Sequence, residues 1–127
     1  MSITDEPGYD ELMEMLDTLN TQYGTMAGKA RTAMLDAKFR GETAKANSFI
    51  AQIKAMSDAH EEAVELIQEK LVSPAQLTAT RSALQTATTR ATDFLETLDA
   101  VAMTLDKATE AAGFLTDLLG DLRQIFP

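Results

Sequence analysis

His60 is the single histidine in a chain of 127 residues that has no cysteine and no tryptophan. Its imidazole is the side chain here best suited to proton transfer near neutral pH. General-base catalysis also requires an oriented partner and a nucleophile within hydrogen-bond reach. The neighbouring acids Asp58, Glu61 and Glu62 are not three or four residues away, so they do not share its helical face. We interpret His60 as a residue at the edge of a helical core, and we expect no catalytic residue.

The acidic residues between positions 58 and 69 are the candidate ligands for a hard cation in this chain. A carboxylate-bridged di-iron bundle needs Glu-x-x-His on two helices, whereas this chain has one His and a serine, Ser57, three residues before it. An EF-hand needs a glycine and a loop of oxygen ligands, and residues 58–69 contain no glycine and are predicted to be helical. Phosphate-binding loops, dinucleotide fingerprints and nucleophile elbows are also missing. The sequence therefore predicts no metal ligand, no cofactor and no enzymatic activity.

Composition and charge indicate whether nucleic acids or membranes are suitable partners for this chain. The chain is 45 % hydrophobic and 24 % charged, as expected for one globular domain, and its net charge is −9. Because phosphate backbones repel such a surface, we expect no nucleic-acid partner. The acidic N-terminus does not resemble a secretion signal, and no apolar run reaches the roughly 18 residues of a membrane span. The sequence predicts a cytoplasmic protein and disfavours a membrane partner.

A helical apolar stripe runs from Tyr9 almost to the last residue. Its steps alternate between three and four residues, the spacing of coiled coils and helical bundles. We predict an all-α fold: a single domain over residues 1–127, built as an antiparallel bundle of three long helices with a C-terminal helical extension or short fourth helix. The expected helices span residues 9–40, 42–71 and 74–112, with the extension or fourth helix at 113–126.

Two helix boundaries have local signals. Gly41 follows the basic last turn of the first helix, a common helix stop. Ser73 and Gln76 fit a capping box around Pro74, a residue favoured at the first helical position. Val72 and Leu77 would then form a hydrophobic staple, and Pro7 would lie in the first turn of the first helix.

The third helix is predicted to be longer than the helices packed against it. Short connections imply antiparallel hairpins, so this helix would lose its partner near residue 104. It could break near Gly113 and fold back as a fourth helix, or continue straight and offer its apolar face to another molecule. The unbroken register, in which only Thr80 interrupts the apolar series, favours continuity. The predicted partner-binding residues are Leu115, Leu118, Leu119, Leu122, Ile125 and Phe126.

Charge is unevenly distributed along the expected rod. Residues 1–20 carry six acids and no base, while residues 21–40 carry four bases and one acid, a net charge of +3. One explanation is that acids at the start of a helix and bases at its end interact favourably with the helix dipole. Electrostatic steering of a second copy or another partner is the alternative explanation.

These observations predict a non-enzymatic helical interaction or assembly protein. It would self-associate as a homo-oligomer, or bind another helical protein, through the amphipathic face at residues 113–126. One alternative is a peripheral binder of lipid or other hydrophobic surfaces, in which the hairpins open. Another alternative is an acidic inhibitor or nucleic-acid mimic that binds a basic protein through the negative end.

Overall fold

The computed structural model describes residues 2–98 and 102–127, and within them the chain is helical with no strand. The prediction of an all-α fold is confirmed. No helix in this part of the chain combines the length and apolar character needed to cross a bilayer. The elements are η1 (Ile3–Asp5, a 3-10 helix), α1 (Tyr9–Phe39), α2 (Thr43–Lys70), α3 (Pro74–Leu98) and α4 (Leu105–Ile125).

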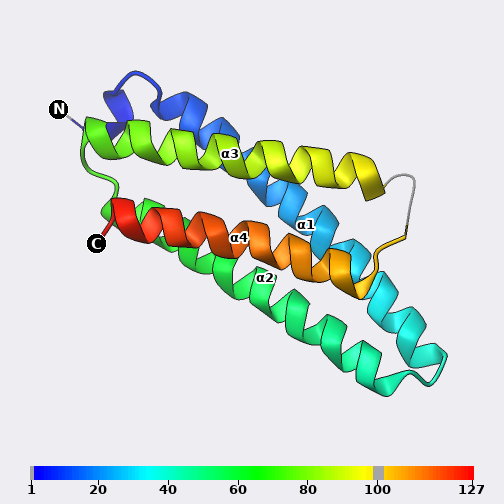
Figure 1. The fold of residues 1–127 in the computed structure, drawn as a ribbon. Helices are drawn as coiled ribbons and strands as arrows, with labels where there is room; N and C mark the ends of the chain where they lie inside the picture. Colours follow the sequence, from blue (N-terminus) through cyan, green and yellow to red (C-terminus); the bar gives the residue numbers. More distant parts are fainter. Residues whose placement is uncertain (1, 99–101) are drawn as a thin grey trace.

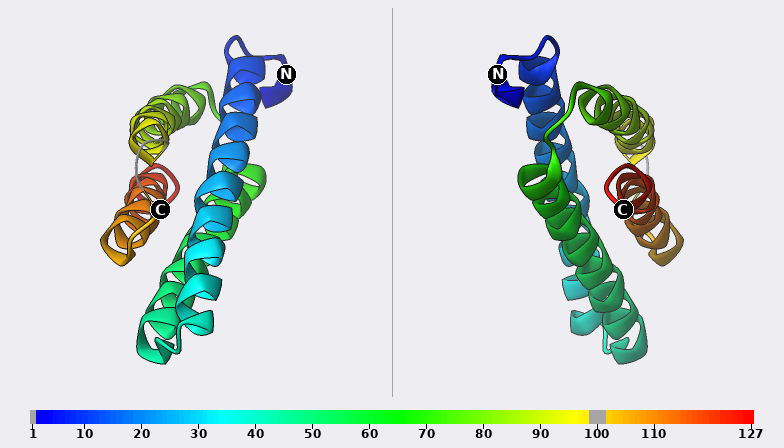
Figure 2. Two further views of the ribbon diagram at one scale, coloured as in Figure 1. Left: turned by 90° about the vertical axis from the view of Figure 1, so that its right-hand side faces the viewer. Right: turned by 90° about the vertical axis from the view of Figure 1, so that its left-hand side faces the viewer.

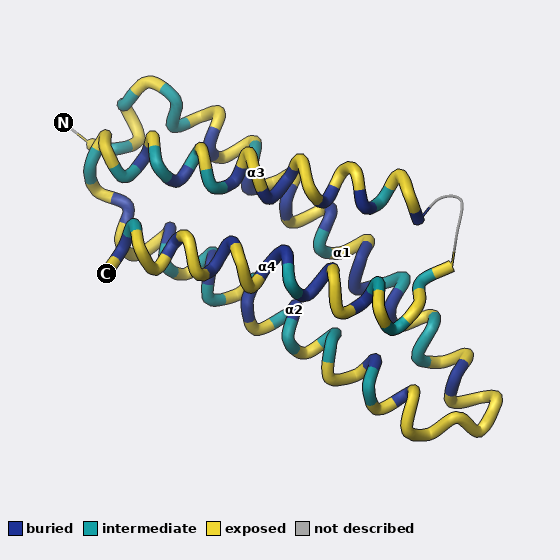
Figure 3. The backbone as a smooth tube through the Cα atoms, viewed as in Figure 1, coloured by how far each residue is buried: buried dark blue, intermediate teal, exposed yellow. Residues whose placement is uncertain are grey.

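The helices form two layers (Figures 1 and 2). The layer of α1 and α2 lies against the layer of α3 and α4, with α1 packed on α2 and α3, and α4 packed on the same two helices. The α1–α2 hairpin projects beyond the other layer (Figure 1). We call residues 29–50, which include its turn, the hairpin tip. Buried positions follow the facing sides of the helices, while the turn itself is exposed (Figure 3).

The turn at Gly41 confirms the predicted end of the first helix. Gly41 has φ +76°, a left-handed conformation that glycine adopts without steric penalty. The Gly41 N–H donates to the carbonyl of Lys38 at 3.0 Å, and the Glu42 N–H donates to that of Ala37 at 2.9 Å. This Schellman arrangement satisfies carbonyls at the end of α1 and reverses the chain into α2.

The capping box at the start of α3 is also confirmed. The Gln76 N–H donates to Ser73 Oγ at 3.2 Å, and the Ser73 N–H donates to Gln76 Oε1 at 3.1 Å. The predicted staple is wrong, because Val72 is 73 % exposed while Leu77 is buried. Leu71 is the buried apolar residue of this connection.

The start of α1 differs slightly from the prediction for Pro7. Pro7 precedes α1, whose first residue is Tyr9. Gly8 is the N-cap residue with φ +94°, and a Cβ built there would lie 2.6 Å from Arg81 Nη1. The chain therefore enters α1 through a left-handed glycine rather than through a proline in the first turn.

The largest correction concerns the third helix. The alternative of a fourth helix is confirmed, but the predicted bounds of 74–112 and 113–126 are wrong, because α3 spans Pro74–Leu98 and α4 begins at Leu105. Thr104 is the N-cap of α4, and its hydroxyl accepts from the Lys107 N–H at 3.2 Å. Leu98 and Leu105 are seven residues apart, so the apolar register continues across the connection. Folding back removes the apolar face of α4 from water, which a straight helix could not do within one chain.

One buried threonine continues the apolar stripe of α3. Thr80 is fully buried, and its hydroxyl has no hydrogen-bond partner in the described part of the chain. A buried polar group without a partner lowers the stability of the fold. Thr80 therefore lies in the core together with the apolar residues of the α3 stripe.

We expect Thr80→Val to raise the free energy of unfolding by about 1 kcal/mol, because a methyl group replaces an unpaired buried hydroxyl of similar size. Urea denaturation monitored by circular dichroism measures this change. Thr78→Val is the matched control, since Thr78 is exposed and its hydroxyl donates to the Pro74 carbonyl at 3.2 Å. The control should change stability by less than about 0.5 kcal/mol. A less stable T80V protein would contradict the prediction.

Candidate functional site

The predicted partner-binding face lies inside the bundle. Leu115, Leu118, Leu119, Leu122 and Phe126 are buried, and Ile125 is half-buried. These side chains belong to one core cluster with residues of α1, α2 and α3. The prediction that this face is open to a partner is therefore wrong for this structure, because α4 folds back and packs the face against its own chain.

Side-chain contacts on the outer side of the core also hold α4 in place. The Phe94 and Phe114 rings meet edge to face, with centroids 5.3 Å apart. The Arg90 guanidinium lies 4.6 Å from the Phe114 centroid and donates to Asp117 at 3.0 Å. The ring pair is buried in the core, whereas Arg90 and Asp117 are partly exposed, so their ion pair adds about 1 kcal/mol or less.

The hairpin tip carries the most exposed large apolar residues on neighbouring turns. Phe39 is 88 % exposed and Leu35 is 48 % exposed. They are four residues apart on α1 and therefore share one face. Ile50 of α2, 44 % exposed, is the third exposed apolar residue of the tip. We call Leu35, Phe39 and Ile50 the tip residues.

The sequence contains a signal for Leu35 and Phe39 that is separate from the main apolar stripe. Leu35 and Phe39 lie off the apolar stripe of α1, which passes through Ala30, Ala33 and Ala37. Large apolar side chains that repeat at four-residue spacing off the buried stripe indicate a second apolar face. The surrounding basic residues made this stretch look like an ordinary helix end.

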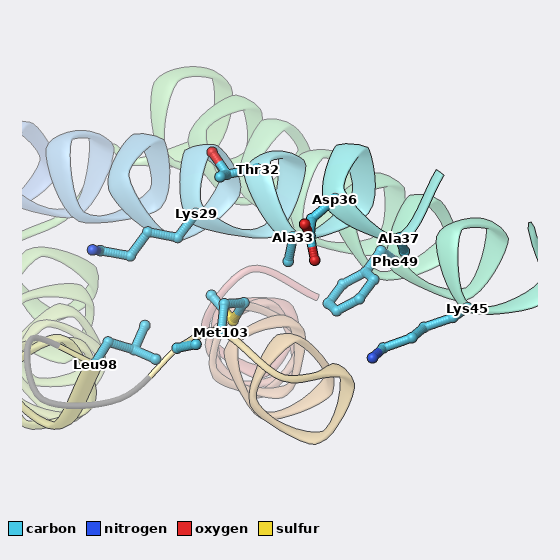
Figure 4. Close-up of a pocket in the computed structure, with 10 residues that line it drawn as sticks. Lys29, Thr32, Ala33, Asp36, Ala37, Lys45, Phe49, Leu98 and Met103 are labelled. Carbon is cyan, nitrogen blue, oxygen red and sulfur yellow. The ribbon is translucent and has the colours of Figure 1, made fainter. Parts of the chain in front are cut away.

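A cavity of about 530 Å³ opens between the hairpin tip and the adjacent ends of the other layer (Figure 4). Its walls come from α1, α2, the end of α3 and the residues before α4. The lining residues are Lys29, Thr32, Ala33, Asp36, Ala37, Lys45, Phe49, Leu98, Ala102 and Met103.

Two of the charged residues that line this cavity, Asp36 and Lys45, form ion pairs. Arg40 Nε donates to the Asp36 carboxylate at 2.9 Å, while Lys45 Nζ lies 3.6 Å from a carboxylate oxygen of Glu42. Both pairs are exposed to water and contribute little to stability. Asp36 and Lys45 are therefore each partly neutralised, and Lys29, which forms no ion pair in the described part of the chain, gives the cavity rim its positive character.

His60 of α2 contacts two residues of α1, Asn20 and Tyr23. Its Nε2 lies 2.6 Å from Asn20 Oδ1, an atom that only accepts, so Nε2 carries the donated proton. Its ring stacks on Tyr23, with centroids 4.3 Å apart and 7° between the planes. Burial lowers the pKa of His60 below its ordinary value of 6.5. The sequence placed His60 at the edge of the core, and the structure has it half-buried there.

The lowered pKa of His60 predicts a pH-dependent stability. The unfolded chain takes up a proton as pH falls through about 6.5, whereas the folded chain does so only at lower pH. The free energy of unfolding should therefore be fully retained above pH 6.5 and should decrease as pH falls below it. Urea midpoints between about pH 7.5 and pH 5.5 measure this change. His60→Gln should flatten the dependence in this window, and an equally steep curve for H60Q would refute the assignment.

The acidic side chains in the described ranges contain no group of three or more potential ligands placed to hold a metal ion. Three of them form ion pairs between helices: Glu62 accepts from Arg123 at 2.7 Å, Asp117 accepts from Arg90 at 3.0 Å, and Glu11 pairs with Arg81. No protein-family model, curated protein or solved structure matches this chain. The features of this structure that bear on function are therefore the cavity, the exposed hairpin tip and the charge distribution.

Proposed function

We propose that this chain, folded as an antiparallel bundle of two helical hairpins, is a non-enzymatic assembly protein that associates with further copies of itself through the hairpin tip. The observation that carries the proposal is the 88 % exposure of Phe39, with Leu35 exposed one turn before it. Large apolar side chains grouped on a projecting element are typical of protein contact surfaces. Aromatic residues of this kind supply much of the binding energy at such contacts.

Charge complementarity supports a second copy as the occupant. Residues 29–45 carry five bases and two acids, so the tip is positive. Residues 1–20, which carry six acids and no base, begin at the opposite end of the α1–α2 hairpin (Figure 1). The last part of α2, with Glu65 and Glu69, lies at that same end. The tip of one molecule is therefore attracted to the acidic end of the next.

A contact between two different surfaces is heterologous and can repeat. Head-to-tail association would place Phe39 and Leu35 beside acidic side chains and exposed apolar residues such as Val72. The exposed charges would steer the encounter, and the apolar side chains would supply most of the affinity. We therefore expect dimers and longer chains whose population depends on protein concentration.

Sedimentation equilibrium at several protein and salt concentrations tests this proposal. The average molar mass should rise with protein concentration and fall with added salt, because salt screens charges beyond about 10 Å at 0.1 M ionic strength. A mass equal to one chain, 13.8 kDa, at every concentration would refute self-association. Oligomers that are insensitive to salt would refute the electrostatic pairing of the two ends.

A further inference from the structure

The cavity beside the hairpin tip has the size and lining of a small-molecule site. Its volume of about 530 Å³ falls within the range of about 300–1,000 Å³ for ligand pockets. It lies where the α1–α2 hairpin projects beyond Leu98, the last described residue of α3 (Figure 1). Side chains from three helices and from Met103 therefore face a common space (Figure 4).

The lining combines an apolar floor with cationic ends. Ala33, Phe49 and Met103 lie toward the centre, and Lys29 and Lys45 stand on either side of them (Figure 4). Lysine stems lie along apolar surface while their ammonium groups reach water. The Asp36 carboxylate also reaches this space, but its charge is partly neutralised by Arg40 at 2.9 Å.

We propose that this cavity binds a free single-chain fatty acid. The alkyl chain lies on the floor of Ala33, Phe49 and Met103, and the carboxylate meets the ammonium group of Lys29 or Lys45. A neutral apolar ligand would make no use of the two cations. A compact polar anion would leave the apolar floor without a contact. A ligand with one anionic head and one alkyl chain matches both parts of the lining.

Isothermal titration calorimetry with decanoate tests this proposal on the full chain. The titration uses the Phe39→Ser background, which we expect to be monomeric, so failure to bind decanoate is distinguishable from failure to self-associate. We expect one site per chain and tighter binding along the series octanoate, nonanoate and decanoate. Each methylene group that becomes buried should increase affinity about fourfold. Decanol should bind about fivefold more weakly than decanoate, because it lacks the charge that the lysines recognise.

Two variants identify the site. The double variant Lys29→Gln/Lys45→Gln should weaken decanoate binding about fivefold and remove the preference over decanol. Lys38→Gln/Lys70→Gln is the matched control, because it removes the same charge from exposed residues that do not line the cavity. Ala33→Leu should weaken decanoate binding severalfold, because the larger side chain occupies part of the apolar floor, with circular dichroism confirming that the variant is folded.

Three results would overturn the proposal. The first is the absence of saturable binding of decanoate. The second is equal weakening by the two double-lysine variants, which would indicate general attraction by net charge. The third is flotation with vesicles of anionic phospholipid in the absence of decanoate binding, which would indicate a membrane surface rather than a free fatty acid as the ligand.

Discussion

Leu122→Asp is expected to unfold the whole bundle. Leu122 has no exposed surface and lies in the core cluster shared by the four helices. Truncation of a buried leucine alone lowers stability by about 2–5 kcal/mol. Burying a carboxylate in its place adds several kcal/mol more, because the charge loses its hydration without gaining a partner. The sum is comparable to the roughly 5–15 kcal/mol that stabilises a typical domain.

Far-ultraviolet circular dichroism and urea denaturation measure this effect. The L122D protein should lose most of its helical signal and its cooperative transition. Gln124→Asp is the control, since Gln124 is an exposed residue in the same turn of α4. It should keep the wild-type signal with a stability change of less than about 1 kcal/mol. An L122D protein that stays helical while only its molar mass changes would show that this face is an interface and that α4 detaches.

Phe39→Ser is expected to abolish self-association without loss of structure. Phe39 is 88 % exposed, so its side chain contributes little to the core of the monomer. Removing a central aromatic side chain from a contact surface commonly lowers binding by 2 kcal/mol or more, which is about thirtyfold in affinity. Phe39→Leu keeps an apolar side chain at this position and should retain most of the association. Sedimentation equilibrium measures both variants.

Mixing two defective variants tests the head-to-tail orientation. Asp10→Lys/Glu14→Lys reverses charge on two exposed residues at the acidic end and should also be monomeric by itself. A 1:1 mixture of this protein with F39S should form a dimer, because one intact tip and one intact acidic end remain. That dimer should not grow further, since neither remaining surface has an intact counterpart. A mixture that stays monomeric would contradict the head-to-tail contact, and a D10K/E14K protein that dimerises by itself would indicate tip-to-tip pairing instead.

Local chemistry was sufficient to predict two helix boundaries. Gly41 ends α1 because it adopts a left-handed conformation that other residues avoid, and the neighbouring N–H groups then complete the Schellman bonds. Ser73 and Gln76 form the capping box by reciprocal hydrogen bonds within four residues. Such interactions depend on nearby residues only, so they can be recognised without knowing the fold.

The sequence by itself determined that this chain is helical, which side of each helix is apolar, and where α1 ends and α3 begins. Only the tertiary structure decided that α3 stops at Leu98 and that α4 returns to the bundle. The apolar register crosses this connection unchanged, and Thr104 is a weak local signal, so the return depends on the apolar area it buries against α2 and α3. The same event buries Leu122, leaves the hairpin tip uncovered and opens the cavity beside Phe49. These are consequences of packing between distant segments, which periodicity within one segment does not encode.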